Sequence, residues 1–202
     1  MLNEWYRTID RNQQQAILND LAAGHFKETE SGIYLPDHNL MASGEYFDRV
    51  NGGEWQTTCN LVVNEGLSHL LNVALGSKAK PAGYYLALFS GSTAPAANWT
   101  AANFAAVASE IVSLTEGYTN ATRPQWVSAD TTTNSIDNFG SVAKVTIATS
   151  SQLTVTGAAM LSNSVRGGTS GVLISATKYT ATRTFQNGDE YEVGYRLSFT
   201  AA

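Results

Sequence analysis

The chain has 202 residues, of which 43% are apolar and only 14% are charged, with a formal net charge of −5. This length and apolar content predict a folded chain with a sizeable core and exclude disorder on compositional grounds. Residues 1–60 carry nine acidic and four basic side chains, and residues 61–202 carry eight of each. Neither part has the basic stripe that nucleic-acid binding requires, so we expect no nucleic-acid partner.

Cys59 is the only cysteine, which excludes an intrachain disulfide and a thiolate metal site. No stretch approaches the roughly 18 apolar residues of a membrane span, so we expect no membrane partner. The first residues are polar and aromatic rather than the apolar run of a secretion signal. The sequence therefore predicts a soluble protein that is made in a cytoplasm.

Residues 9–23 have the pattern of a first helix. Asp10 and Gln13 have the spacing of a capping box, and Gly24 follows the last helical position. Ile17 and Leu21 lie on one narrow apolar stripe with Ile9. A stripe this narrow predicts packing on one neighbour rather than burial inside a core.

Residues 25–58 sustain neither a helical nor a strand period, and glycine and proline interrupt them repeatedly. We predict that residues 1–59 form a helix followed by an extended interaction arm, and that residues 60–202 form a separate β domain. The alternative is a peripheral loop folded over its own domain. The side chains expected to contact a partner are the large apolar ones of this region, namely Trp5, Tyr6, Phe26, Tyr34, Leu35, Tyr46, Phe47 and Trp55.

A second helix is predicted over residues 61–75, with an apolar face formed by Leu67, Leu70, Leu71 and Ala74. Gly66 inside it indicates close packing, or a helix that starts nearer Asn64. A short, aromatic and buried strand is predicted over residues 84–89, followed by a helical turn over 101–108.

The rest of the sequence predicts strands, at 125–127, 135–136, 142–148, 153–161, 172–176, 181–185 and 190–200. Alternation is clearest in the last, where Tyr191, Val193 and Tyr195 share one side with Leu197 and Phe199. The predicted fold class is mainly β: an antiparallel β-sandwich, jelly-roll-like or another Greek key, with one or two helices.

Side chains suited to catalysis or metal binding are few and scattered. His25, His38 and His69 are not spaced as metal ligands, and His69 is interpreted as a helix-surface or hydrogen-bonded boundary histidine. The segment Arg166–Gly171 lacks the lysine and the spacing of a phosphate-binding loop, which favours a flexible hairpin loop. We therefore expect no catalytic residue, no metal site and no cofactor, and a protein that is not an enzyme.

Three aromatic residues, Trp99, Tyr118 and Trp126, lie in or beside predicted loops. Exposed rings stack on sugars, so these residues leave a glycan-binding role open as an alternative. For Trp126, the favoured interpretation is a residue of the core.

Several short blocks follow one another from Asn60 onward: residues 60–67 (NLVVNEGL), 84–91 (YYLALFSG), 116–126 (EGYTNATRPQW), 135–138 (SIDN) and 167–171 (GGTSG). In this order they resemble a family of small structural proteins of tailed-bacteriophage particles, over about residues 61–202. The resemblance implies a virion protein and brings no catalytic motif with it.

Together with the low charge and the aromatic arm, this resemblance predicts a head decoration, or cement, protein. It would bind the major capsid protein or another virion protein as a homo-oligomer, on the head surface, and stabilise the head. Two alternatives remain: a tail or fibre-adaptor protein of the same particle, and a carbohydrate-binding module that contacts the host surface.

Overall fold

The computed structural model describes residues 26–28, 34–36 and 41–200, with side chains from residue 42 onward. It divides into two units, residues 1–41 with 200–202, and residues 42–199. In the first unit, β1 (Phe26–Glu28) pairs antiparallel with β2 (Tyr34–Pro36). The helix predicted over residues 9–23 lies outside the described residues.

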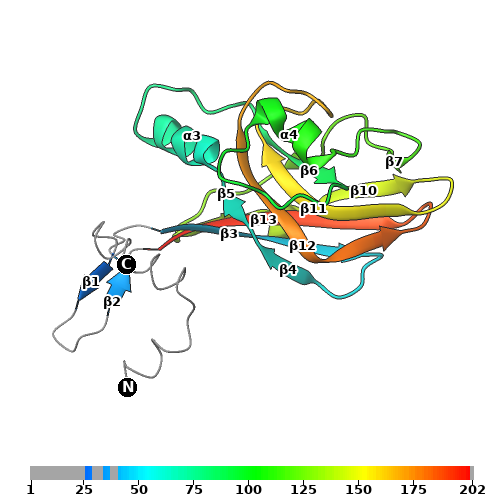
Figure 1. Cartoon of the computed structure of the whole chain (residues 1–202), viewed down its shortest axis with the longest axis horizontal. Coiled ribbons are helices and arrows are strands. Elements are labelled where there is room, and N and C mark those ends of the chain that lie inside the picture. The colour runs from blue at the N-terminus through cyan, green and yellow to red at the C-terminus, as the bar shows by residue number, and fades with distance from the viewer. Residues whose placement is uncertain (1–25, 29–33, 37–40, 201–202) are drawn as a thin grey trace, which may run out of the picture. The chain divides into compact units, whose positions relative to one another are not determined.

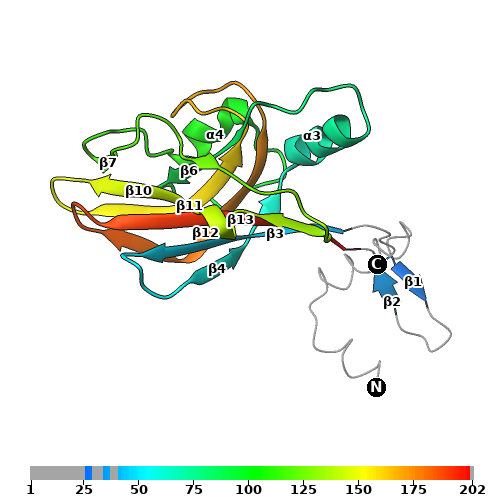
Figure 2. The same cartoon turned by 180° about the vertical axis from the view of Figure 1, so that it is seen from behind.

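The second unit is a β-sandwich of two sheets (Figures 1 and 2), which confirms the predicted fold class. One sheet has the order β4–β3–β13–β10–β7, and β9 also pairs with β13. Its strands are β3 (Met41–Val50), β4 (Gln56–Cys59), β7 (Gly117–Tyr118), β9 (Ser135–Asp137), β10 (Ala143–Ala148) and β13 (Glu190–Thr200). The other sheet has the order β5–β12–β11–β6–β8. Its strands are β5 (Leu61–Val62), β6 (Tyr84–Phe89), β8 (Gln125–Trp126), β11 (Leu153–Leu161) and β12 (Leu173–Phe185).

The main core lies between the two sheets and follows the period of two that strands impose on their side chains. From β13 it receives Tyr191, Val193 and Tyr195, which are fully buried, and from β10 it receives Val145 and Ile147. The clean alternation read from the sequence of these strands is therefore the alternation between core and outer face.

A second core lies on the outer face of the five-stranded sheet, where α4 (Ala101–Ala108) covers it. Phe104 of α4 packs edge-to-face against Phe89 and Trp99, with ring centroids 6.1 and 6.4 Å away. Helix α4 begins after Thr100, whose backbone N–H donates to the Asn103 side chain. The predicted helical turn is thus the outer layer on this side of the sandwich.

The second predicted helix is α3, which begins at Asn64 and ends at Ala74. It starts later than residue 61 because Leu61–Val62 pairs with β12 as β5. Its predicted apolar face is present but largely exposed: Leu67 and Leu71 are 39% and 61% exposed. Among the described residues, no helix is long and apolar enough to cross a membrane.

The segment predicted as an extended arm is also corrected in part, because residues 41–59 fold into the sandwich. Here β3 and β4 form an antiparallel hairpin, and Tyr46 is fully buried in the main core. The unit boundary therefore falls at residue 41 rather than residue 59. The sequence of β3 shows no alternation of apolar and polar residues because the strand buries side chains on both faces, and because Asp48 occupies one of its inward positions.

Asp48 is tolerated there because Arg183 of the opposite sheet neutralises it. The Arg183 guanidinium donates to both carboxylate oxygens, at 2.7 and 3.0 Å. It also lies over the ring of Tyr179, whose hydroxyl accepts a hydrogen bond from Tyr191 at 2.8 Å. Burial raises the pKa of Tyr179 and Tyr191, so both hydroxyls stay neutral. The polar cluster joins the two sheets, because its members come from strands of both.

Candidate interaction surface

The outer face of the six-stranded sheet carries a cluster of three aromatic rings, which we call the aromatic patch. It consists of Phe47 from β3, Trp55 from the β3–β4 connection, and Phe139 from the short helix η1 (Phe139–Ser141). Ring centroids lie 5.8 Å apart for Phe47–Trp55 and 5.3 Å apart for each other pair. Phe139 is 52% exposed, so its ring extends the patch into solvent.

Two local features of the backbone place these rings. Asn51 and Gly52 both have positive φ, 50° and 70°, and Gly53 donates to the Val50 carbonyl at 2.9 Å. This is the tight hairpin turn that Asn-Gly favours, and it returns the chain so that Trp55 lies beside β3. Under Phe47, the strand β13 carries Gly194, where a Cβ atom would lie 2.1 Å from the Phe47 ring.

The third ring is held by hydrogen bonds around η1. The Phe139 N–H donates to the Asp137 carboxylate at 2.9 Å, and the Tyr195 N–H donates to the Asn138 side chain at 3.0 Å. Asn138 is buried, and its amide group donates to the Ser141 carbonyl. The exposed ring of Phe139 therefore stands on a backbone that is fixed to β13.

Ion pairs flank the patch on this face. The guanidinium of Arg49 lies 4.4 Å from the Trp55 ring centroid and also donates to Glu192, which pairs with Lys144 at 2.7 Å. Because Arg49 and Lys144 donate to it, the pKa of the Glu192 carboxyl is lowered from its usual value.

On the other flank, Arg196 contacts Asp137 at 2.9 Å and Glu45 at 2.8 Å. Burial raises the pKa of Asp137, but its hydrogen bonds from Phe139 and Arg196 outweigh that effect and lower it overall. The two networks together contribute three cations and three anions, so they are charge-balanced.

This arrangement suits binding of a protein surface. Protein interfaces concentrate their binding energy in buried Trp, Tyr and Arg side chains, which a polar border shields from water. The aromatic patch has a tryptophan, a stacked arginine and a half-exposed phenylalanine, inside a border of paired charges. The cations and anions of the two flanking networks neutralise one another, so these six groups leave no net charge for a partner to compensate.

The residues predicted to contact a partner do not all lie on one exposed surface. Tyr46 is a core residue and is corrected, because its side chain points between the sheets and donates to the Ser175 carbonyl. Phe47 is 3% exposed and forms the base of the patch, whereas Trp55 is partly exposed within it. For the remaining candidates, Trp5, Tyr6, Phe26, Tyr34 and Leu35, side chains lie outside the described residues.

The aromatic residues considered for sugar stacking are buried. Trp99 and Trp126 are 4% and 8% exposed, and Tyr118 is fully buried. The indole N–H of Trp126 donates to the Tyr195 carbonyl at 2.9 Å, which confirms the interpretation of Trp126 as a core residue. A glycan-binding role cannot use these three rings as they stand in this structure.

His69 is a hydrogen-bonded boundary histidine, as interpreted. Its Nε2 atom lies 2.9 Å from the Tyr84 hydroxyl, and burial together with nearby Lys78 lowers its pKa. Within the described part of the chain, no group of three or more His, Cys, Asp or Glu side chains is arranged to hold a metal ion.

The Arg166–Gly171 segment connects β11 and β12, as predicted, but it is tied down rather than free. The Arg166 guanidinium donates to four backbone carbonyls, those of Ile111, Ser113, Tyr118 and Asn120, at 2.6–3.3 Å. The Gly167 N–H donates to Glu110. These donors are already used inside the protein, so the loop does not offer them to an anion.

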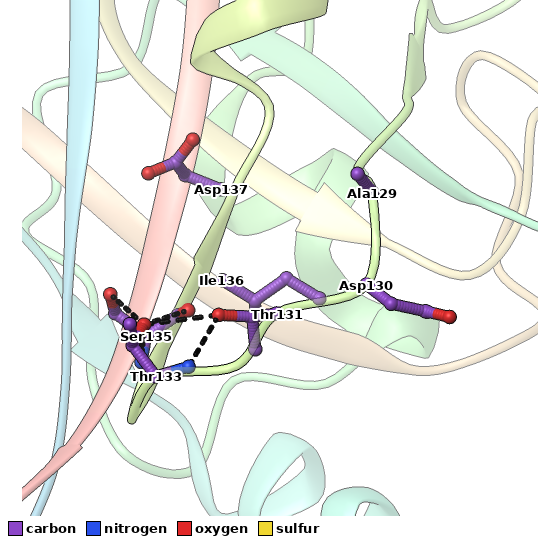
Figure 3. A pocket seen from close by; sticks show the side chains of 7 residues that line it. All are labelled: Ala129, Asp130, Thr131, Thr133, Ser135, Ile136 and Asp137. Atoms are coloured by element: carbon purple, nitrogen blue, oxygen red, sulfur yellow. Dashed lines mark hydrogen bonds between the residues drawn. The ribbon is translucent and has the colours of Figure 1, made fainter.

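A shallow polar depression of about 230 Å³ lies beside β9 (Figure 3). The hydroxyls of Thr131 and Thr133 bond to each other at 3.0 Å, and Thr133 also contacts Ser135. Asp137, which borders the depression, is paired with Arg196. These hydroxyls and the Asp137 carboxylate therefore already have partners within the protein, which makes the depression a weaker candidate site than the aromatic patch.

Two members of the interaction surface, Arg49 and Phe139, were missed by sequence reasoning. The Asn51-Gly52 turn was the available signal, since Asn-Gly between apolar segments predicts a hairpin and would have brought Arg49 opposite Trp55. For Phe139 no local signal exists, because its neighbours in the patch come from another part of the chain. Comparison of the chain with protein-family models and with curated protein sequences finds no match.

Proposed function

We propose that this chain is a structural protein of a tailed-bacteriophage particle that binds the head surface as a decoration, or cement, protein. The observation that carries the proposal is the aromatic patch, a partly exposed group of three rings in tilted and edge-to-face contact on the outer face of the six-stranded sheet. The order of the sequence blocks, which resembles that in small virion proteins, supports the assignment to a phage particle. The partner is the major capsid protein or another virion protein.

The sandwich supports a role that depends on rigidity. Its buried charges, Asp48 with Arg183 and Glu110 with Arg123, are paired with one another across the fold. A cement protein must hold a fixed shape while it connects neighbouring subunits of a shell under internal pressure. A surface that is already in its binding geometry loses little conformational entropy on docking, which favours affinity.

The test is binding of the full-length chain to heads assembled without it, measured by co-sedimentation. Replacing Trp55 by alanine removes one of the three rings, and the loss of a hot-spot tryptophan costs about 2 kcal/mol or more, or roughly 30-fold in Kd. Phe139→Ser should weaken binding in the same direction. Leu114→Ser is the matched control, because Leu114 is 53% exposed against 52% for Phe139 but lies outside the patch.

The outcomes separate the candidate functions. If both patch variants bind heads as well as the unmodified chain does, the patch is not part of the contact with the head. Binding to tails and not to heads would favour the alternative of a tail or fibre-adaptor protein. Binding to a glycan array that Trp55→Ala abolishes would favour the carbohydrate-binding alternative, through different rings from those first considered.

The position of β3 limits how a role of the N-terminal region can be tested. A deletion of residues 1–58 would remove β3, which lies beside β13 inside the sandwich. Such a deletion would unfold the domain and report nothing about an arm. A role of residues 1–40 is instead tested by substituting Trp5, Tyr6, Phe26, Tyr34 and Leu35 in the full chain.

A further inference from the structure

Two hairpin turns of the chain share the dipeptide Asn-Gly, and they lie next to each other. Asn51-Gly52 lies between β3 and β4, and Asn187-Gly188 lies between β12 and β13. The Asn51 backbone N–H donates to the Glu190 carbonyl at 2.9 Å, so the first turn is attached to the second hairpin. All four residues of the two dipeptides are exposed, so burial does not distinguish the two turns.

The side chain of Asn51 also connects the two hairpins, and we call this contact the Asn51 latch. Its amide nitrogen donates to the Asp189 carboxylate at 2.8 Å, and its amide oxygen accepts from the Glu190 N–H at 2.8 Å. The hydrogen bond from Asn51 and another from the Gln186 N–H lower the pKa of the Asp189 carboxyl, so Asp189 is ionised at neutral pH. The latch therefore pairs a neutral amide with a charged carboxylate.

An asparagine that precedes glycine can lose its side-chain amide without an enzyme. The deprotonated backbone nitrogen of the glycine bonds to the asparagine Cγ, the Cγ–Nδ2 bond breaks, and the departing nitrogen takes a proton from water and leaves as ammonia. Water then opens the resulting cyclic imide at either carbonyl, which gives an aspartate or an isoaspartate. Water is thus consumed and ammonia released, with no oxidant or reductant. Glycine favours the reaction because no Cβ shields the attacking nitrogen.

The attacking nitrogen is in a different state in the two turns. Among the hydrogen bonds of the described residues, none uses the Gly52 N–H, and a Cβ atom on Gly52 would have no neighbour within 4 Å. In contrast, the Gly188 N–H donates to the Ile147 carbonyl at 2.9 Å. The nitrogen of Gly188 must therefore give up a hydrogen bond before it attacks, whereas the nitrogen of Gly52 need not.

The bonds of the latch do not lie along the direction of attack. A nucleophile approaches a carbonyl carbon from above or below the amide plane, whereas hydrogen bonds to an amide lie near that plane. The Glu190 N–H donates to the oxygen of Asn51 on which negative charge develops during the attack, and such a donor stabilises the intermediate.

We propose that Asn51 is a site of spontaneous deamidation and that its product releases the latch. An aspartate at position 51 has no N–H to donate, and it places a second carboxylate against that of Asp189. An isoaspartate also lengthens the backbone of the tight turn. Because Trp55 follows this turn, the change acts on the aromatic patch. The inference concerns the chain itself and does not rest on the virion function.

Peptide mapping by mass spectrometry, after incubation of the full chain at mildly alkaline pH, measures the conversion at both turns. In the folded chain Asn51 should convert at least about fivefold faster than Asn187, the factor that one hydrogen bond of ordinary net strength represents. In urea the two should convert at similar rates, so the unfolded chain is the control for intrinsic reactivity. Conversion at Asn187 that equals or exceeds that at Asn51 in the folded chain overturns the proposal.

Release of the latch is tested separately with Asn51→Asp, which is one of the two products. At neutral pH its folding equilibrium constant in urea unfolding should fall about fivefold or more, and the NMR signal of the Trp55 indole should shift. Adding Asp189→Asn exchanges the two groups and should recover most of the loss, because the amide at position 189 donates to the carboxylate at position 51. An Asn51→Asp variant as stable as the unmodified chain, or a double variant no more stable than the single one, contradicts the release.

Discussion

The buried ion pair between Glu110 and Arg123 gives a sharp test of how the loops at one end of the sandwich are held. Both side chains are fully inaccessible, and the guanidinium donates to both carboxylate oxygens at 2.7 Å. Arg123 also donates to the carbonyls of Asn163 and Gly168. The pair therefore connects the β11–β12 loop to the rest of the fold.

Glu110→Gln keeps the shape of the side chain and leaves the buried guanidinium without a counter-charge. Removing one partner of such a pair costs about 3–5 kcal/mol. At about 2–4 °C per kcal/mol for a domain of this size, the melting temperature should fall by roughly 6–20 °C. Urea unfolding followed by circular dichroism gives the free energy, and thermal unfolding gives the shift.

Two controls make the test decisive. Glu45→Gln breaks a contact to Arg196 in which both side chains are more than a third exposed, and it should cost less than about 1 kcal/mol. The double variant Glu110→Leu with Arg123→Met removes both charges, so it should be more stable than Glu110→Gln alone. A Glu110→Gln cost below 1 kcal/mol, or a double variant no better than the single one, would refute this reasoning.

Three further predictions concern the patch, acid stability and α3. Gly194→Ala pushes a methyl group into the Phe47 ring and should cost about 1–3 kcal/mol in urea unfolding, whereas Gly140→Ala, with open space around its Cβ, should change little. The pKa of Glu192 is lower in the folded chain than its usual 4.5, so the ionised carboxylate stabilises the fold above pH 4.5 and this stabilisation is lost as the pH falls through the folded-state pKa. In Glu192→Gln, the free energy of unfolding should therefore decrease less steeply with falling pH in the acid range. The pKa of His69 is lowered on folding, so an NMR titration should place its midpoint below 6.5. The contribution of His69 to the free energy of unfolding should decline as the pH falls below 6.5. A midpoint at or above 6.5 would contradict the burial of His69 against Tyr84.

Several features of this protein follow from the sequence alone. Strand β13 alternates so regularly that its core face, with Tyr191, Val193 and Tyr195, is read directly from the residues. The helical turn of α4 and the buried strand β6 are equally local, since capping and apolar content fix them. The sandwich class follows from these elements, because strands with one apolar face must bury it against another sheet.

Other features were decided only by tertiary structure, for one physical reason: what covers a side chain often comes from a distant part of the sequence. Strand β3 reads as irregular because Phe47 on its outer face is covered by Phe139, while Asp48 on its inner face is neutralised by Arg183. The leucines of α3 resemble a core stripe, yet the helix contacts β12 through Gly66, which turns Leu71 outward. Local periodicity reports which side chains are apolar, and only the packed fold determines which of them remain exposed for a partner.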